Sequence, residues 1–196
     1  MLDYGIGNLR SAQKSLERAG ADAIVTRDHR VIDAAAGVVL PGVGAMGRCM
    51  ESLDKAGLRE IALEMIACGR PFLGVCVGMQ MLHRGSEEFG GVEGLGVFDA
   101  MVRLLPDDVK RPQMQWNTLS KRAPTRLLDG LPDPPWVYFV HSYAPEVHPD
   151  VVATCDYGGP VSAIVERANV AGTQFHPEKS GSVGVALLAN FVSACA

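Results

Sequence analysis

The sequence has 196 residues, of which 47% are apolar and 20% charged, and its formal net charge is −4. That length suffices for one domain with a sizeable core, and a mildly acidic chain without a Lys/Arg cluster argues against a nucleic-acid partner. No apolar run reaches the ~18 residues of a membrane helix and no secretion signal opens the chain, so we expect a cytoplasmic protein that binds no membrane.

Five cysteines are spread along the chain without any Cys-x-x-Cys pair: Cys49, Cys68, Cys76, Cys155 and Cys195. An odd number of widely spaced cysteines indicates neither a zinc site nor a redox dithiol, and it fits a reducing compartment. We therefore expect no metal site, and we interpret four of these cysteines as small buried apolar side chains.

The first half alternates short apolar strands with helices. Strands are predicted at 1–5, 23–26, 37–42 and 71–76, and helices at 8–20, at 50–69 with a possible break at Gly57, and from 78 onward. Only two residues precede Asp3, so we expect a short first strand, or a true start that lies upstream. Strands separated by helices predict a parallel sheet with helices on both faces.

The second half is richer in β pattern. Strands are predicted at 96–105, 136–145, 151–158, 162–168 and 170–176, followed by a closing helix at 180–195. No linker, repeat or low-complexity segment divides the sequence, so we expect a single domain over residues 1–196. The predicted fold class is α/β, with a mostly parallel central sheet and an antiparallel, β-rich part in the second half.

The stretch "GVCVG", residues 74–78, places Cys76 where a predicted strand ends and a helix begins. Glycines on both sides remove the Cβ clashes of so tight a turn, and the start of a helix favours a thiolate. This is the strand–nucleophile–helix elbow with sulfur in place of oxygen. Cys76 is therefore a candidate nucleophile, and an unreactive buried thiol is the alternative.

The stretch "HPE" places His176 and Glu178 on either side of Pro177. In extended backbone, residues i and i+2 point to the same side, and the proline favours an extended His176. A carboxylate beside an imidazole fixes its tautomer and stabilises the imidazolium. With Cys76 the pair supplies a nucleophile, its base and the residue that orients the base, although "HPE" alone equally fits an ordinary surface turn.

The stretch "LPGVG", residues 40–44, follows another buried strand. Backbone with two glycines can turn an N–H group inward, so the N–H of Val43 is predicted to form an oxyanion hole with that of Val77, just after the nucleophile. A common strand-ending turn is the alternative.

These three stretches, in this order, resemble the class I (triad) glutamine amidotransferases, which have a three-layer, flavodoxin-like fold. Within that class, the glutaminase subunits of imidazole glycerol phosphate synthases, of histidine biosynthesis, are similar over "DYGIGNLRS", "LPGVGAMG", "GVCVGMQ", "YFVHSY" and "GTQFHPEKSG". The resemblance runs from Asp3 to the C-terminal helix. The stretch "PQMQWN" departs from it, because Gln113 and Gln115 stand where the family has histidine and glycine.

The resemblance implies roles for further residues. Glutamine would be bound by Gly42 and the backbone near Val43, with Gln80, Glu88, Ser142 and Tyr143. The synthase subunit would be met by Asn8, Trp116, Tyr138 and Lys179. From the residues alone, core positions are favoured for Trp116 and Tyr138, and His141 is expected to be structural.

The resemblance also implies an activity and a partner. Glutamine would be hydrolysed to glutamate and ammonia without metal or organic cofactor. The ammonia would pass through a tunnel in a heterodimer to a (β/α)₈-barrel cyclase that forms imidazole glycerol phosphate and aminoimidazole carboxamide ribotide. The alternatives are a paralogue that serves another barrel synthase, for example in sugar amidation, a non-catalytic regulatory subunit, and a free-standing cysteine hydrolase.

Overall fold

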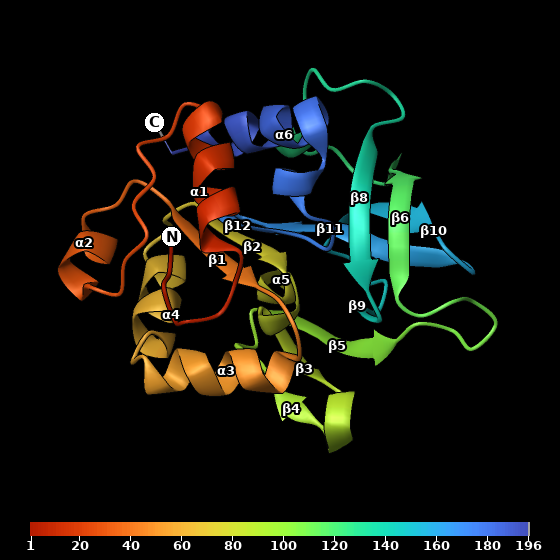
Figure 1. Cartoon of the computed structure of the whole chain (residues 1–196), viewed down its shortest axis with the longest axis horizontal. Coiled ribbons are helices and arrows are strands. Elements are labelled where there is room, and N and C mark those ends of the chain that lie inside the picture. The colour runs from red at the N-terminus through yellow and green to blue at the C-terminus, as the bar shows by residue number, and fades with distance from the viewer. Residues whose placement is uncertain (196) are drawn as a thin grey trace.

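The computed structural model describes residues 1–195 and shows three layers, a central β-sheet with helices on both faces (Figure 1). One face carries α1 (Leu9–Arg18) and α6 (Gly181–Ser193), which contact each other. The other face carries α3 (Met46–Lys55), α4 (Arg59–Ala67) and α5 (Val77–Met81), and the short α2 (His29–Asp33) contacts α4. The predicted layered α/β arrangement is confirmed.

The central sheet has a parallel and an antiparallel half. Its order is β1-β2-β12-β11-β10-β7. The parallel strands are β1 (Val38–Gly42), β2 (Phe72–Cys76) and β12 (Val170–Thr173). The antiparallel strands are β11 (Pro160–Arg167), β10 (Val151–Asp156) and β7 (Ser120–Lys121). Parallel strands are covered on both faces, and β1, β2 and β12 are buried along their whole length.

Two smaller sheets extend the molecule. One has the order β4-β3-β5-β9, formed by β4 (Val92–Glu93), β3 (His83–Ser86), β5 (Phe98–Leu104) and β9 (Tyr143–Pro145). The other pairs β6 (Gln113–Thr118) with β8 (Trp136–His141). Short 3₁₀ turns complete the fold: η1 (Glu88–Gly90), η2 (Arg126–Leu128) and η3 (Pro177–Lys179).

Several boundaries differ from the sequence-based expectation. The helix predicted from 78 onward ends at Met81 and is followed by β3 from His83. The strands predicted at 1–5 and 23–26 are reduced to one parallel bridge between Leu2 and Thr26. The helix predicted at 50–69 begins earlier, at Met46, and it divides at Gly57, the predicted possible break, where φ is +67°. The strand predicted at 136–145 divides at Ser142 between two sheets, and β6 was not predicted. Within residues 1–195, no helix combines the length and the apolar character that crossing a bilayer demands.

Candidate active site

Cys76 lies at the end of β2, directly before α5, with φ +55° and ψ −111°. A non-glycine residue holds so unusual a backbone conformation only where its surroundings impose it, and such positions gather at functional sites. Here the surroundings are backbone. A Cβ on Gly74 would lie 2.7 Å from the carbonyl oxygen of Gly78, and one on Gly78 would collide with the carbonyl oxygen of Leu40. The predicted elbow is thus present, with the thiol buried inside it.

His176 follows β12 in extended backbone, and Glu178 lies two residues further on. The Nδ1 atom of His176 lies 2.7 Å from Oε1 of Glu178, and both side chains are about 95% buried, at 4% and 5% exposure. Burial alone lowers the pKa of His176, but its hydrogen bonds to Cys76 and Glu178 outweigh burial and raise the pKa to about 10. At neutral pH the structure therefore favours an imidazolium between a sulfur and a carboxylate.

The segment that carries His176 is anchored to β8 by Ser180. The N–H of Tyr138 donates to Oγ of Ser180 at 3.0 Å, and the same hydroxyl donates to the carbonyl of His176 at 2.7 Å. A direct backbone bond from the N–H of His176 to the carbonyl of Tyr138, 3.1 Å long, runs beside it. Sequence reasoning gave Ser180 no role, because a serine after "HPEK" carries no pattern of its own.

The loop that contains Val43 lies beside the nucleophile. Gly42 is paired with Cys76 across β1 and β2, and a Cβ on Gly42 would lie 2.5 Å from the N–H nitrogen of Gly78. Val43 is 38% exposed and Val77 is buried. The structure thus places both predicted oxyanion segments next to Cys76.

Gln80 and Glu88, the predicted substrate side chains, already hold bonds within the protein. Nε2 of Gln80 donates to the carbonyl of Tyr143 at 2.8 Å and to Oε1 of Gln174 at 3.1 Å. Glu88 is buried, and its Oε2 accepts from the N–H of Met46, the first residue of α3, at 2.7 Å. Both side chains therefore brace the walls of the site, whatever they contribute to binding.

Three further side chains complete this wall. His141 donates from Nδ1 to the carbonyl of Tyr143 at 2.9 Å, which is the structural role expected of it, and Ser142 between them is half-buried. Gln174, which sequence reasoning did not single out, points its Nε2 at Sγ of Cys76 from 3.8 Å. A glutamine at the end of a buried strand, two residues before "HPE", was the only available signal.

Three of the four predicted interface residues, Asn8, Trp116 and Lys179, are exposed, and Tyr138 is half-buried. Trp116 is 48% exposed, and its ring meets that of Tyr138 edge-on across the β6–β8 pair, with centroids 5.9 Å apart. Met114 and Trp136 are also exposed there. The core position favoured for Trp116 from the residues alone is therefore wrong. Lys179 is exposed in η3, which contacts α1, and Asn8 is exposed directly before α1.

The two departures from the family pattern have different surroundings. Gln113 is fully buried; its Nε2 lies 3.7 Å from Sγ of Cys155, and its Oε1 has no partner within residues 1–195. It is paired in register with His141, whose Nε2 also lacks a partner among those residues. Gln115 is exposed and pairs in register with Phe139.

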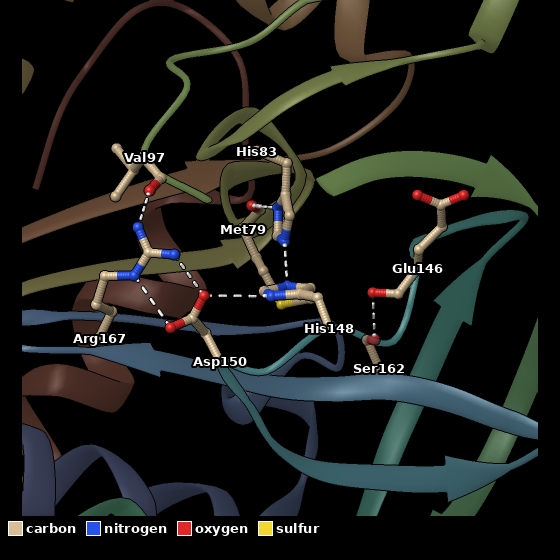
Figure 2. A network of polar contacts seen from close by, with 8 residues as sticks. All are labelled: Met79, His83, Val97, Glu146, His148, Asp150, Ser162 and Arg167. Carbon is tan, nitrogen blue, oxygen red and sulfur yellow. Dashed lines mark hydrogen bonds and ion pairs between the residues drawn. The ribbon is translucent and has the colours of Figure 1, made fainter. Parts of the chain in front are cut away.

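A partly buried polar network supports α5 through Met79 (Figure 2). Nδ1 of His83 donates to the carbonyl of Met79 at 2.9 Å, and its Nε2 lies 3.2 Å from Nε2 of His148. His148 in turn faces Asp150, which Arg167 binds with two nitrogens. Burial lowers the pKa of His83 to about 4, so this histidine is neutral at pH 7. The network, which sequence reasoning missed, holds α5, the helix that directly follows Cys76.

Comparison with known proteins first defines the class. Residues 1–195 match the family model described as "Glutamine amidotransferase class-I". The solved structure titled "Crystal structure of glutamine amidotransferase" superposes with a TM-score of 0.75 at 19% identity, covering 99% of this chain and 97% of that one. So low an identity speaks for the fold alone, and fold and family model together define a class I glutamine amidotransferase.

Closer relatives define the family within that class. "Imidazole glycerol phosphate synthase subunit HisH" of Methanothermobacter thermautotrophicus is 47% identical over 193 residues, which covers 98% of this chain and 96% of that protein. The protein of the same name from Geobacter sulfurreducens is 46% identical over 201 residues, covering 97% and 96%. The chain therefore belongs to the HisH family of class I glutamine amidotransferases.

Proposed function

We propose that this chain hydrolyses glutamine with Cys76, His176 and Glu178, and that it supplies the ammonia to the cyclase subunit of an imidazole glycerol phosphate synthase. The carrying observation is the buried hydrogen-bonded pair of His176 and Glu178 beside a cysteine held at φ +55°. A cysteine kept only for packing has no need of either feature.

The first chemical step is attack of the Cys76 sulfur on the carboxamide carbon of glutamine. As the C–S bond forms, the carbonyl oxygen becomes negative, and the N–H groups of Val43 and Val77 stabilise it. The C–N bond then breaks while the His176 imidazolium gives its proton to the departing nitrogen. Ammonia leaves, and a γ-glutamyl thioester remains on Cys76.

The second step releases glutamate. His176, now neutral, takes a proton from a water molecule whose oxygen attacks the thioester carbonyl. The C–S bond then breaks, which restores the Cys76 thiolate beside the His176 imidazolium and releases glutamate. Glu178 orients the imidazole and stabilises its cation throughout. Gly42, Gln80, Glu88, Ser142 and Tyr143 form the pocket for glutamine, and the carboxylate of Glu88 suits its ammonium group. The reaction requires no metal or organic cofactor.

The ammonia needs a protected route, because in water it is protonated and ceases to be a nucleophile. The relatives are named as subunits of a synthase, which implies a second subunit. We assign its docking to the outer face of the β6–β8 pair together with Asn8 and Lys179, where exposed aromatic side chains gather. Exposed apolar clusters of this kind mark protein contacts, and a barrel cyclase joined in a heterodimer by an ammonia tunnel fits them.

The test is glutamate release from L-glutamine by the wild type and by Cys76→Ala and Cys76→Ser, each with the cyclase subunit present. Loss of an essential nucleophile should lower turnover by several orders of magnitude in both variants. Thermal unfolding and binding of the cyclase serve as controls and should stay close to wild type. Substantial glutamate release by a folded Cys76→Ala protein would overturn the assignment.

A further inference from the structure

Two side chains outside the triad hold the loop from Gly42 to Gly44 through hydrogen bonds. Tyr4 and Cys49 are both buried, at 5% and 0% exposure, and they come from the N-terminal segment and from α3. The hydroxyl of Tyr4 donates to the carbonyl of Pro41 at 2.5 Å. The thiol of Cys49 donates to the carbonyl of Val43 at 3.4 Å.

The bond from Tyr4 replaces a missing strand contact. Along this edge of β1, the carbonyl of Val39 accepts from the backbone N–H of Leu2 at 3.0 Å. Two residues further on, the N-terminal segment has left the sheet, and the Tyr4 side chain bonds the next carbonyl on the same edge, that of Pro41. A buried carbonyl without a partner is costly, so the hydroxyl has a reason to stay there.

The Tyr4 hydroxyl and the Cys49 thiol both remain protonated hydrogen-bond donors near neutral pH. Burial, followed by the nearby sulfur of Cys49, raises the pKa of Tyr4, and burial also raises the pKa of Cys49. Hydroxyl and thiol therefore both keep their protons. The start of α3, two residues after the loop, is held as well, because the N–H of Met46 donates to the Glu88 carboxylate at 2.7 Å.

Between the bonded carbonyls of Pro41 and Val43 lies the peptide group that joins Gly42 to Val43. The N–H of Val43 makes no hydrogen bond with any atom of residues 1–195, and Gly44 beyond it has φ +86°. The peptide plane on each side is held through its carbonyl by a side chain. Within residues 1–195, no side chain bonds the plane that joins Gly42 to Val43. This is the plane whose N–H serves the oxyanion in the proposed reaction.

We propose that Tyr4 and Cys49 are positioning residues. They clamp the peptide planes before and after the Gly42–Val43 peptide, so that only the Gly42–Val43 peptide turns its N–H toward the oxyanion. The inference rests on the proposed function, in which Val43 is an oxyanion donor. Because such a donor acts in the transition state, loosening its loop lowers kcat and leaves KM nearly unchanged.

The test variants are Tyr4→Phe, which keeps the ring and removes the donor, and Cys49→Ala. Removing a whole oxyanion donor costs about 10²–10³ in kcat, so a loosened one should cost about tenfold in each variant, with KM within about twofold. Cys49→Ser, which keeps a donor, should recover most of the Cys49→Ala loss. Alkylation of Cys76 by iodoacetamide should keep its wild-type rate, because the thiol itself is untouched.

Matched controls exist in the same chain. The hydroxyl of Tyr157 donates to the carbonyl of Lys110 at 2.7 Å, and the thiol of Cys68 to the carbonyl of Met65 at 3.2 Å, neither beside the loop. Tyr157→Phe and Cys68→Ala should therefore leave kcat at the wild-type value. If Tyr4→Phe and Cys49→Ala behave like these controls, the clamp does not exist.

A readout that needs no catalysis separates this inference from the proposed function. NMR order parameters of the Val43 and Gly44 amides should fall in Tyr4→Phe from about 0.85 toward 0.6 or below, while those of α3 stay unchanged. If the wild type hydrolyses glutamine no faster than Cys76→Ala, the proposed function fails. The order parameters alone then decide whether Tyr4 and Cys49 clamp the loop. Unchanged order parameters overturn it in either case.

Discussion

The parallel half of the central sheet and the β6–β8 pair carry different parts of the proposed activity under different physical constraints. At the ends of β1 and β2, backbone atoms approach so closely that Gly42, Gly74 and Gly78 leave no room for a side chain. The outer face of β6 and β8 instead exposes Met114, Trp116 and Trp136. In the proposed function, catalysis therefore depends on closely packed backbone, and partner binding depends on side chains that extend into solvent. Substitutions should separate the two.

The largest effect is expected from Gly78→Ala. Its Cβ would collide with the carbonyl oxygen of Leu40, and backbone on both sides cannot yield, so α5 must shift away from Cys76. We expect glutamine hydrolysis to be lost and the free energy of unfolding to fall by about 1–3 kcal/mol, as for an overpacked core. Both are measured on the purified variant, by glutamate release and by urea denaturation.

Gly47→Ala in α3 is the matched control, since a Cβ there would have one neighbour, a methyl group of Val92 at 3.1 Å. It should keep its activity, and a helical alanine offsets part of any strain. A Gly78→Ala protein as active as Gly47→Ala would show that the close backbone approach is not what builds the elbow.

An intermediate effect is expected on the other side of the comparison, from Trp116→Ala and Lys179→Ala. Anchoring aromatics and desolvated charges at an interface each cost about 2 kcal/mol or more when truncated, which corresponds to roughly 30-fold in the dissociation constant. Association with the cyclase subunit should weaken, and more glutamine should be consumed per product formed. Thioester formation on Cys76 should persist.

Ile24→Ala provides the control for these two, because Ile24 is 51% exposed and its carbonyl bonds the amine of Met1, next to the Leu2–Thr26 bridge on the β1 side of the sheet. It should change neither the dissociation constant nor the ratio of glutamine consumed to product formed. Wild-type values of both quantities in Trp116→Ala and Lys179→Ala would place the docking face elsewhere.

A smaller effect concerns the charge state of the triad. Burial lowers the pKa of His176, but Cys76 and Glu178 raise it above the ordinary 6.5 to about 10. A raised pKa means that the imidazolium stabilises the fold fully below pH 6.5, and that this contribution is lost as the pH rises through about 10. Glu178→Gln removes one of the raising partners, so the pKa should fall.

The measurement is an NMR titration of His176 in the wild type and in Glu178→Gln. The stability difference between the two proteins should be larger at pH 7 than above the folded-state pKa of about 10. His141, whose pKa burial lowers to about 4, is the internal reference. An unchanged pKa of His176 in Glu178→Gln would mean that the carboxylate orients nothing.

The same comparison explains what the sequence could predict. Glycine spacing, a β-branched run and "HPE" are local signals, so the elbow at Cys76, the loop at Val43 and the parallel strands were predictable from sequence. The exposure of Trp116 was not predictable, because the sequence pattern of an aromatic residue on a two-stranded sheet is the same as that of a core residue. Only the neighbouring elements decide whether it is covered. The clamp at Tyr4 and the bonds of Gln174 join segments far apart in sequence and carry no local pattern.

The most direct test of the central claim is mass spectrometry of the enzyme after acid quenching during turnover of L-glutamine. The account predicts a γ-glutamyl adduct on the peptide that contains Cys76, linked through sulfur and removed by hydroxylamine. His176→Ala should form this adduct far more slowly, and Cys76→Ala should not form it. Turnover without an adduct in the wild type, or an adduct on another cysteine, would contradict the account.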